Sequence, residues 1–349
     1  MGFSRELQKR VRGVQERLES GGVDALYVSN PKNVLYLTGR ESGRLLLTKR
    51  KGYLWVRNLY KELYSDLYSS KGYPCEVKVY RDMAVVDKVK FIGCRRLGVD
   101  NVSLSYYNTM RRRFKCRLKP AAIVEEERAV KTDYEMDILR KSASTASKAM
   151  RKAYEVVKSG VREMDAVAEI ECYIRKMGSE TPPFNEGMHL AFGVNSSNIH
   201  AYPTKQIMKR GLVIVDLGAR IQGYYSDMTR TMAVGRLSSR EKGLKNSVRS
   251  LEFAAVDMIQ PGMKASEVHE FISSELEKKG FEFHHAAGHG VGLEVHEKPS
   301  ISPESQDTFK EGMVFTIEPG VYIPKKFGVR FEDMVVLTKK GCRMLTKGP

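Results

Sequence analysis

Five potential metal ligands each lie inside a short apolar segment, and this arrangement limits what the chain can fold into. The segments read VIVDLG (213–218), YYSDMTRTMAV (224–234), AAGHGVGLEVHE (286–297), VFTIEPGVYIP (314–324) and VRFEDMVVL (329–337). The ligands that they carry are Asp216, Asp227, His289, Glu318 and Glu332. Burying a carboxylate in an apolar strand is costly unless it is paired or bound to a cation. A single such residue could be a satisfied core acid, but four carboxylates and one imidazole together indicate a site for divalent metal.

The spacing of these residues predicts that they converge on a sheet. Asp216 and Asp227 lie on two apolar runs joined by a short turn at 221–223, so they can meet across a hairpin. Glu318 and Glu332 lie on a second pair of runs, joined through residues 324–328. Two hairpins that face each other would bring the four carboxylates together, with enough negative charge for two divalent ions. Glycines on both sides of His289 allow the backbone to approach such a site closely.

Length and charge indicate two domains. A chain of 349 residues is too long for one ordinary core. Residues 1–125 hold 26 Lys and Arg against 12 Asp and Glu, whereas residues 126–349 hold 33 against 30. This shift predicts a boundary near residue 125. Basic clusters such as Arg111–Arg113 could contact nucleic acid, but they are scattered and no recognition motif accompanies them. A solvated basic face is the favoured interpretation, and nucleic acid is not an expected partner.

The sequence also predicts where such a protein would reside. No stretch approaches 18 consecutive apolar residues, so no membrane span is expected. The first residues are charged and lack the apolar region of a signal peptide. The five cysteines are odd in number and form no CxxC pair, which argues against a disulfide framework. A cytoplasmic location is therefore expected.

The pattern of apolar residues outlines the secondary structure. In the first domain, Leu7, Val11, Val14 and Leu18 recur at helical spacing. Strands are expected at 24–29, 44–48, 52–56 and near 98–100, and helices near 57–70 and 103–113, which predicts a mixed sheet flanked by helices. In the second domain, Thr132 and Glu135 form a capping box that opens a helix over 133–158. Further helices are expected at 162–177, 238–260 and 266–280.

Four motifs follow one another in the order of a known family. DLGARIQGYYSDMTRT (216–231), GHGVGLEVHEKP (288–299), TIEPGVYIP (316–324) and GVRFED (328–333) resemble the successive signatures of the pita-bread metallopeptidases. That family includes methionine aminopeptidases, Xaa-Pro aminopeptidases and Xaa-Pro dipeptidases (prolidases). The segment SNPKNVLYLTG (29–39) resembles the N-terminal domain of the creatinase-like, proline-specific branch. The resemblance implies an α+β fold: a C-terminal pita-bread domain and a smaller N-terminal α/β creatinase-like domain.

The resemblance also implies roles for the five ligands. Asp216 would hold one metal ion, His289 and Glu318 the other, and Asp227 and Glu332 would bridge both. Manganese or cobalt is expected first, although zinc and iron also suit this set. Two such ions can share a hydroxide that attacks the peptide carbonyl at neutral pH. In the family, Glu318 would also shuttle a proton to the leaving proline nitrogen.

Four further residues match family positions. His200 and His296 correspond to catalytic histidines, and His296 would hydrogen-bond the substrate carbonyl or the intermediate. His285 corresponds to a residue that lines the proline pocket, and Arg330 to an arginine that orients the carboxylates. The remaining histidines match nothing and are expected to be structural or exposed. They are His189, His269 and His284.

One departure from the family bears on the substrate. In the dipeptidase branch an arginine commonly follows the HExP tetrapeptide and anchors the free carboxylate of a dipeptide. Here HEKP (296–299) is followed by Ser300. Without that clamp, the expected activity is that of an Xaa-Pro aminopeptidase acting on proline-containing peptides, with an Xaa-Pro dipeptidase as the alternative. A homodimer is expected from the resemblance alone.

Two other kinds of protein share the fold. Creatinase hydrolyses a non-peptide substrate without metal, and some relatives are non-catalytic proteins that bind nucleic acid or histones. Those binding proteins typically lose metal ligands. The complete set of five in this chain argues against both readings, although the basic first domain keeps a binding role as the more distant alternative.

Overall fold

The computed structural model describes residues 2–64, 72–80 and 93–348. Contacts between Cα atoms divide the chain into two compact units. Unit 1 runs from Met1 to Arg128 and unit 2 from Ala129 to Pro349. No helix among the described residues is long and apolar enough to cross a bilayer. The two units mix helices and strands, as expected for an α+β protein.

Unit 1 is built on one sheet with strand order β4-β3-β2-β1-β5-β6. Strand β2 pairs antiparallel with β1 and β3, whereas the other neighbours are parallel, so the sheet is mixed as predicted. The strands are β1 (Ala25–Val28), β2 (Arg44–Thr48), β3 (Gly52–Arg57), β4 (Glu76–Tyr80), β5 (Arg96–Val99) and β6 (Arg117–Pro120). Successive residues of a strand face opposite sides, and burial of Ala25 to Val28 shows that both faces of β1 are covered.

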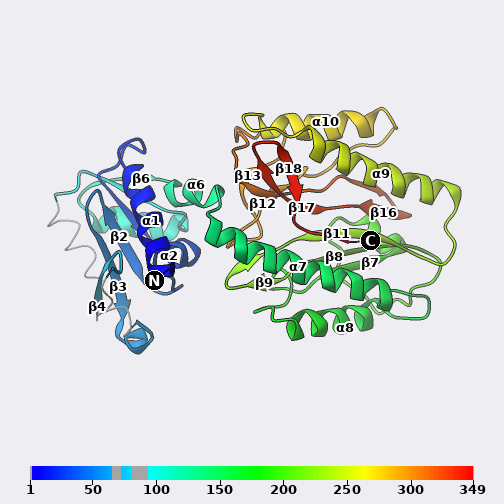
Figure 1. Cartoon of the computed structure of the whole chain (residues 1–349), viewed down its shortest axis with the longest axis horizontal. Helices are drawn as coiled ribbons and strands as arrows, with labels where there is room; N and C mark the ends of the chain where they lie inside the picture. The colour runs from blue at the N-terminus through cyan, green and yellow to red at the C-terminus, as the bar shows by residue number, and fades with distance from the viewer. Residues whose placement is uncertain (1, 65–71, 81–92, 349) are drawn as a thin grey trace. The chain divides into compact units, whose positions relative to one another are not determined.

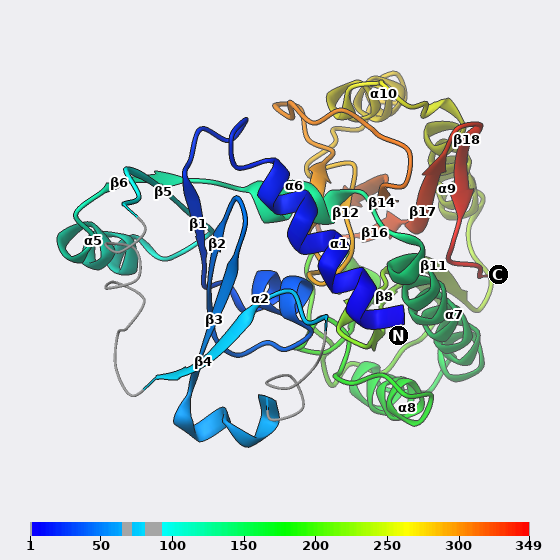
Figure 2. The same ribbon diagram turned by 60° about the vertical axis from the view of Figure 1, so that its left-hand side comes forward.

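Helices cover the two faces of this sheet. Figure 2 shows α1 (Gly2–Glu16) and α2 (Pro31–Thr38) on one side of the strands and α5 (Leu104–Arg113) on the other. The apolar stripe predicted for the first helix is buried, with Leu7, Val11 and Val14 at most 3% exposed. The helix predicted near 57–70 is wrong over the described residues, which form two short 3₁₀ helices, Asn58–Tyr60 and Glu62–Tyr64. Residues 65–70 lie outside the described part of the chain.

Unit 2 contains two larger sheets, each packed against a pair of helices (Figure 1). Helices α7 (Asp133–Val156) and α8 (Glu163–Lys176) share a core with the sheet β11-β8-β7. Helices α9 (Ser239–Met258) and α10 (Ala265–Glu277) share a second core with the sheet β13-β12-β14-β17-β18. The strands of the first sheet are β7 (His189–Phe192), β8 (Gly211–Leu217) and β11 (Met228–Val234). Those of the second are β12 (His289–Gly290), β13 (Glu297–Ser300), β14 (Val314–Ile317), β17 (Asp333–Thr338) and β18 (Gly341–Met344).

Local sequence signals fix the start of the long helix α7. The Thr132 hydroxyl accepts a hydrogen bond from the Glu135 backbone N–H at 3.3 Å, and the Glu135 carboxylate accepts one from the Thr132 N–H at 3.0 Å. These two bonds form the predicted capping box, which satisfies backbone donors that the first turn of a helix leaves free. The same device begins α9, where Ser238 pairs with Glu241.

The two sheets of unit 2 meet at a single backbone bridge between Thr229 and Glu332. The Thr229 N–H donates to the Glu332 carbonyl at 3.2 Å, and the Glu332 N–H donates to the Thr229 carbonyl at 3.1 Å. Both predicted hairpins converge here. In one, β8 pairs with β11 so that Asp216 lies opposite Thr229. In the other, β14 pairs with β17 so that Ile317 lies opposite Asp333, which places Glu318 and Glu332 side by side. Small hairpins connect the paired strands: β9 (Arg220–Ile221) with β10 (Tyr224–Tyr225), and β15 (Gly320–Ile323) with β16 (Phe327–Arg330).

Candidate metal centre

A cavity of about 860 Å³ opens where the two sheets of unit 2 meet. Every residue to which the sequence assigned a role at the site lines it. These are Asp216, Asp227, His289, Glu318 and Glu332, together with His200, His285, His296 and Arg330. The hairpins supply the four carboxylates and strand β12 supplies His289. The fold therefore brings segments far apart in the sequence to one cavity.

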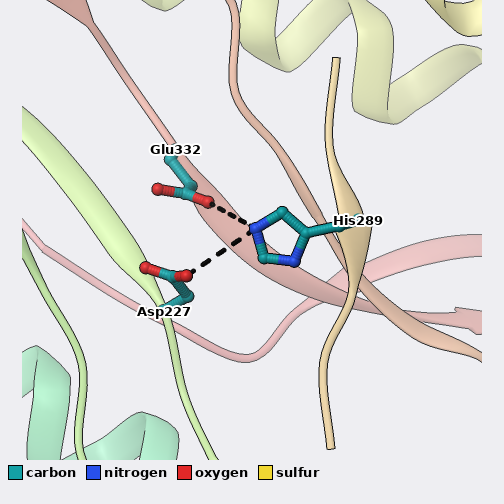
Figure 3. Close-up of side chains that lie close together, drawn as sticks. All are labelled: Asp227, His289 and Glu332. Carbon is teal, nitrogen blue, oxygen red and sulfur yellow. Dashed lines mark ion pairs between the residues drawn. The ribbon is translucent and has the colours of Figure 1, made fainter. Parts of the chain in front are cut away.

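Three of the five ligands lie closest together (Figure 3). One ligand atom from each of Asp227, His289 and Glu332 lies within 4.8 Å of the others. His289 Nε2 is 3.7 Å from Asp227 Oδ2 and 3.9 Å from Glu332 Oε1. The other ring nitrogen, Nδ1, lies 3.2 Å from the Gly290 carbonyl oxygen, which requires Nδ1 to carry the proton. Nε2 is thus left with a lone pair directed towards the carboxylates, as a metal ligand needs.

The other two candidate ligands, Glu318 and Asp216, line the same cavity. Glu318 Oε1 is 3.8 Å from His289 Nε2. One oxygen of Asp216, Oδ2, accepts a hydrogen bond from Arg330 at 2.6 Å, whereas its Oδ1 is buried and has no hydrogen-bond partner among the described residues. The same holds for Asp227 Oδ1 within the described part of the chain. Buried carboxylate oxygens without donors are costly, and a bound cation would offset that cost.

The pKa shifts of the residues that line the cavity also favour a bound cation. Burial, together with repulsion from neighbouring carboxylates, raises the pKa of Asp227 and of Glu318 well above their ordinary values and raises the pKa of Glu332 to about 7. Burial and the neighbouring His296 lower the pKa of His289 to about 3, so its imidazole is neutral near pH 7. Crowded acids beside a neutral imidazole need positive charge, and a hard divalent cation matches a donor set of oxygens with one nitrogen. The residues present therefore fit a divalent metal.

Close backbone packing explains the glycines around His289. A Cβ on Gly290 would lie 2.0 Å from the Lys298 carbonyl oxygen, and one on Gly288 would lie 2.0 Å from that of Thr316. Gly288 also has a φ of +155°, a backbone angle that residues other than glycine rarely adopt. Only glycine lets strand β12 run this close to its neighbours, and this approach carries His289 into the cavity.

Arg330 belongs to a chain of hydrogen bonds that ends at Asp216. His285 Nδ1 lies 2.8 Å from the Ala286 carbonyl oxygen and so carries the proton, which leaves Nε2 to accept from the Tyr322 hydroxyl at 3.2 Å. The Tyr322 hydroxyl in turn accepts from Arg330 Nη1 at 2.8 Å, and Arg330 Nη2 donates to Asp216. Burial and the Arg330 charge lower the pKa of His285 to about 4, so the chain holds a neutral imidazole.

Aromatic rings form one wall of the cavity, and sequence reasoning missed three of them: Phe184, His189 and Tyr202. His189 stacks on His200 with ring centroids 5.9 Å apart and meets the edge of Tyr202 at 5.5 Å. The sequence placed His189 among structural or exposed residues, yet it lines the cavity. Its cross-strand pairing with Asp216 could have revealed it, but only once the register of β7 on β8 is known. The other two histidines without a predicted role do not line the cavity: His269 packs on Phe283, and His284 is 45% exposed.

His296 lies directly beside His289. Their rings meet edge to face with centroids 4.2 Å apart. Burial lowers the pKa of His296, so its ring is neutral near pH 7 and offers an N–H donor to a molecule in the cavity.

Comparisons with known proteins agree with this geometry. Residues 137–339 match the metallopeptidase family M24, and residues 10–130 match the creatinase/prolidase N-terminal domain. The Xaa-Pro dipeptidase of Pyrococcus horikoshii is 32% identical over 98% of this chain and 97% of its own length. The structure of an Xaa-Pro dipeptidase from Bacillus anthracis is 28% identical, with a TM-score of 0.91 over 98% of each chain. That of an X-Pro aminopeptidase from Thermotoga maritima is 26% identical, with a TM-score of 0.83 over 96% of this chain and 98% of its own.

Proposed function

Because the chain belongs to metallopeptidase family M24, we propose that it is an Xaa-Pro dipeptidase, which hydrolyses the bond between an N-terminal residue and a following proline. The observation that carries the proposal is the cavity in which four carboxylates and His289 converge. The relatives support the choice of substrate, because the similar proteins from Pyrococcus horikoshii and Bacillus anthracis are both named Xaa-Pro dipeptidase. They support this alternative better than the aminopeptidase that Ser300 favoured.

The proposal includes two divalent metal ions, manganese or cobalt first, with zinc or iron as possible substitutes. Asp216 would hold one ion, His289 and Glu318 the other, and Asp227 and Glu332 would contact both. When bound, such ions polarise the scissile carbonyl and lower the pKa of water. Asp216 Oδ1 and Asp227 Oδ1 support this donor set, since both are buried and neither has a hydrogen-bond partner among the described residues.

The side chains around the ions would share the remaining work. Glu318, whose Oε1 lies 3.8 Å from His289 Nε2, would take a proton from the attacking water and pass it to the proline nitrogen, which is a poor leaving group until it is protonated. His296 would donate a hydrogen bond to the carbonyl oxygen as charge develops there. His200, which lines the same cavity, would assist His296 in stabilising the charge on that oxygen. His285 would line the proline pocket, and Arg330 would hold Asp216 in place through its 2.6 Å bond.

The role of His296 can be measured separately from metal binding. His296→Ala is expected to lower kcat by about 100-fold, the effect typical of losing one donor to a developing oxyanion, while bound metal stays at the wild-type level. Steady-state kinetics together with metal analysis of the same samples test this. His284→Ala is the matched control, since His284 is exposed and does not line the cavity. An unchanged kcat in His296→Ala would give this residue a structural role instead.

One observation favours the second candidate, an Xaa-Pro aminopeptidase acting on longer peptides. Among the described residues that line the cavity, Arg330 is the one Lys or Arg side chain. Its guanidinium already donates to Asp216, Tyr322, Thr229 and the Ile199 carbonyl. The substrate's carboxylate would then depend on histidines or backbone N–H groups. A paired assay of an Xaa-Pro dipeptide and its one-residue extension separates the candidates: the dipeptidase proposal requires a higher kcat/KM for the dipeptide, and the opposite ratio would replace it with the aminopeptidase.

A substitution at Ser300 is expected to change the ratio of kcat/KM for the dipeptide to kcat/KM for its one-residue extension. Ser300 lines the cavity, and Ser300→Arg would restore the clamp common in the dipeptidase branch. A charge-assisted hydrogen bond contributes about 1.5–3 kcal/mol, so the preference for the dipeptide should rise roughly 10- to 100-fold. Ser302→Arg is the control, because it adds the same charge two residues away at a position that does not line the cavity. Equal shifts in both variants would mean that the added charge acts at long range and not as a clamp.

Three further parts of the proposal rest on the sequence alone. They are a domain boundary after residue 125, a homodimeric assembly and a cytoplasmic location. Sedimentation of the purified protein tests the second of these.

A further inference from the structure

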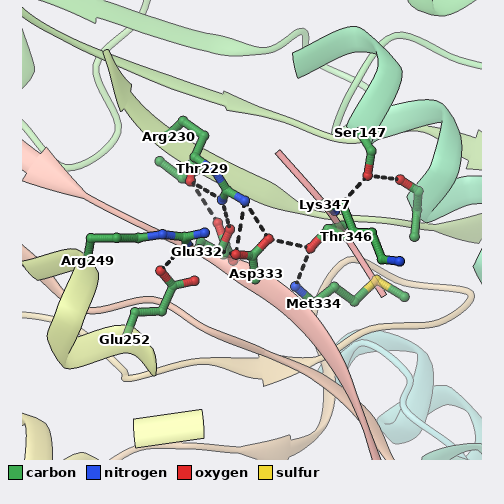
Figure 4. A network of polar contacts seen from close by, with 11 residues as sticks. Ser147, Thr229, Arg230, Arg249, Glu252, Glu332, Asp333, Met334, Thr346 and Lys347 are labelled. Carbon is green, nitrogen blue, oxygen red and sulfur yellow. Dashed lines mark hydrogen bonds and ion pairs between the residues drawn. The ribbon is translucent and has the colours of Figure 1, made fainter. Parts of the chain in front are cut away.

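A cluster of four charged side chains, three of them buried, lies immediately behind the candidate metal centre (Figure 4). It comprises Arg230 of β11, Asp333 of β17, and Arg249 and Glu252 of α9. None of these four residues lines the cavity. The cluster holds two guanidinium and two carboxyl groups, so its formal charges balance without a ligand. Its contacts nevertheless extend to the backbone of Glu332, which is one of the proposed bridging ligands.

Arg230 is the member that reaches the metal centre. Its side chain is completely buried. Nη1 donates to the carbonyl oxygens of both Thr229 and Glu332, at 2.9 and 2.8 Å. Nη2 donates to the two carboxylate oxygens of Asp333, at 2.8 and 3.0 Å. One planar guanidinium therefore fastens the backbone on both sides of the Thr229–Glu332 bridge and, at the same time, the side chain that follows Glu332.

That bridge lies beside both proposed bridging ligands. Asp227 is two residues before Thr229 on one sheet, and Glu332 directly precedes β17 on the other. The Thr229 hydroxyl also donates to Glu332 Oε2 at 2.8 Å, which orients the carboxylate itself. Asp227 and Glu332 thus come from different sheets, and the isolated pair Thr229–Glu332 is the direct backbone link between them.

A lysine could not replace the arginine in this arrangement. Four hydrogen bonds hold the planar guanidinium of Arg230 in one orientation. A lysine ammonium is instead a compact point charge without a planar geometry. The neighbouring Arg249 differs in what it touches. Its Nη1 contacts Asp333 at 2.8 Å and also Glu252, its side chain is 21% exposed, and no bond joins it to Glu332 among the described contacts.

We propose that Arg230 is a positioning residue of the metal centre, which fixes Glu332 relative to Asp227 by fastening the backbone bridge between the two sheets. It acts through Glu332 and contacts neither substrate nor metal. The inference rests on the proposed metal site but not on the proposed substrate. Groups that orient metal ligands from behind typically contribute 10- to 100-fold in metal affinity.

The test compares Arg230→Lys with Arg249→Lys, which make the same chemical change in the same cluster. The full-length protein is stripped of metal and titrated with Mn²⁺ by calorimetry, and the electron paramagnetic resonance spectrum of the bound Mn²⁺ is recorded. Arg230→Lys is expected to weaken Mn²⁺ binding by at least about tenfold and to change the spectrum, because Glu332 loses its fixed position. Arg249→Lys is expected to bind within about twofold of wild type with an unchanged spectrum.

A second variant covers the case in which Arg230→Lys does not fold. Arg230→Met combined with Asp333→Leu removes the buried pair as a unit, and such exchanges are often neutral for stability. The charges of Arg249 and Glu252 then still balance. This double variant should also bind Mn²⁺ at least about tenfold more weakly. Wild-type affinity in either folded variant overturns the inference. Failure of the unmodified protein to bind Mn²⁺ would instead overturn the proposed metal site, so the two failures are distinguishable.

Discussion

Asp227→Asn is expected to abolish peptidase turnover and to reduce the manganese that the protein binds. The substitution keeps the size of the side chain and removes one charge from the ligand whose two oxygens would contact both ions. Asp227 lies 3.7 Å from His289 Nε2 at the centre of the cavity. Metal ions contribute several kcal/mol to such reactions, and each 1.4 kcal/mol or so is a factor of ten, so kcat should fall at least about 1,000-fold.

A measurement of thermal stability distinguishes this loss of turnover and metal from unfolding of the variant. Burial and three neighbouring carboxylates raise the pKa of Asp227, so removing its charge relieves repulsion in the metal-free protein. Metal-free Asp227→Asn should therefore melt no lower than the metal-free wild type. Asp257→Asn, at an exposed position of α9, is the control for the loss of one charge. A variant at position 227 that kept full metal content and a near-normal rate would refute the proposed donor set.

Gly290→Ala is expected to destabilise unit 2 by about 3 kcal/mol or more and to impair metal binding. The added Cβ would lie 2.0 Å from the Lys298 carbonyl oxygen, which belongs to the backbone of the neighbouring strand. A flexible side chain could move aside, but here β12 and β13 must separate. Overpacking a well-packed site costs about 1–3 kcal/mol and occasionally more. The displaced strand carries His289, so Mn²⁺ affinity should fall together with the midpoint of denaturant unfolding.

Gly243→Ala provides the opposite expectation for the same chemical change. Gly243 lies inside α9, and a Cβ there would meet nothing within 4 Å. Alanine favours a helix interior over glycine by roughly 0.8–1 kcal/mol, so this variant should be slightly more stable than wild type and bind Mn²⁺ normally. Equal stability of Gly290→Ala and wild type would mean that the strands can separate at little cost, contrary to the packing described above.

Sequence reasoning succeeded where a signal is local. The capping box at Thr132 predicted the start of α7, and the apolar runs that hold Asp216 and Glu318 predicted strands on the paired hairpins. These features depend on neighbours within a few residues or on the cost of burying charge, and both can be read from one sequence.

The predicted helix near 57–70 shows where such signals mislead. Leu59 and Leu63 are four residues apart and suggest an apolar helical face, yet they are 83% and 54% exposed. Within the described part of this segment, residues 57–64, the buried side chain is Tyr64, whose hydroxyl donates to the Ser42 carbonyl. That contact depends on a distant part of unit 1, and it supports a short 3₁₀ turn in place of a long helix.

Tertiary register hid other parts of the site. His189 enters the cavity because β7 pairs with β8, and nothing near it in the sequence indicates this. The chain of hydrogen bonds from His285 through Tyr322 to Arg330 joins the segment before β12 to the β15–β16 hairpin. The motif that contains Arg230 does not reveal its role either, because its partner Asp333 belongs to the other sheet. The substrate preference could not be settled from Ser300 alone, since one missing cation does not reveal which groups replace it.

The joining of two sheets at Thr229 and Glu332 has a consequence for the lifetime of the protein in a cell. Since each sheet contributes part of the proposed donor set, an ion held between them would act as a removable crosslink that favours the closed state over every opened one. Binding to the folded state alone adds about 2.7 kcal/mol when the free ion is at 100 times its Kd. A shortage of the metal would then both inactivate the site and expose the chain to degradation. The abundance of the protein would therefore depend on the availability of its own cofactor.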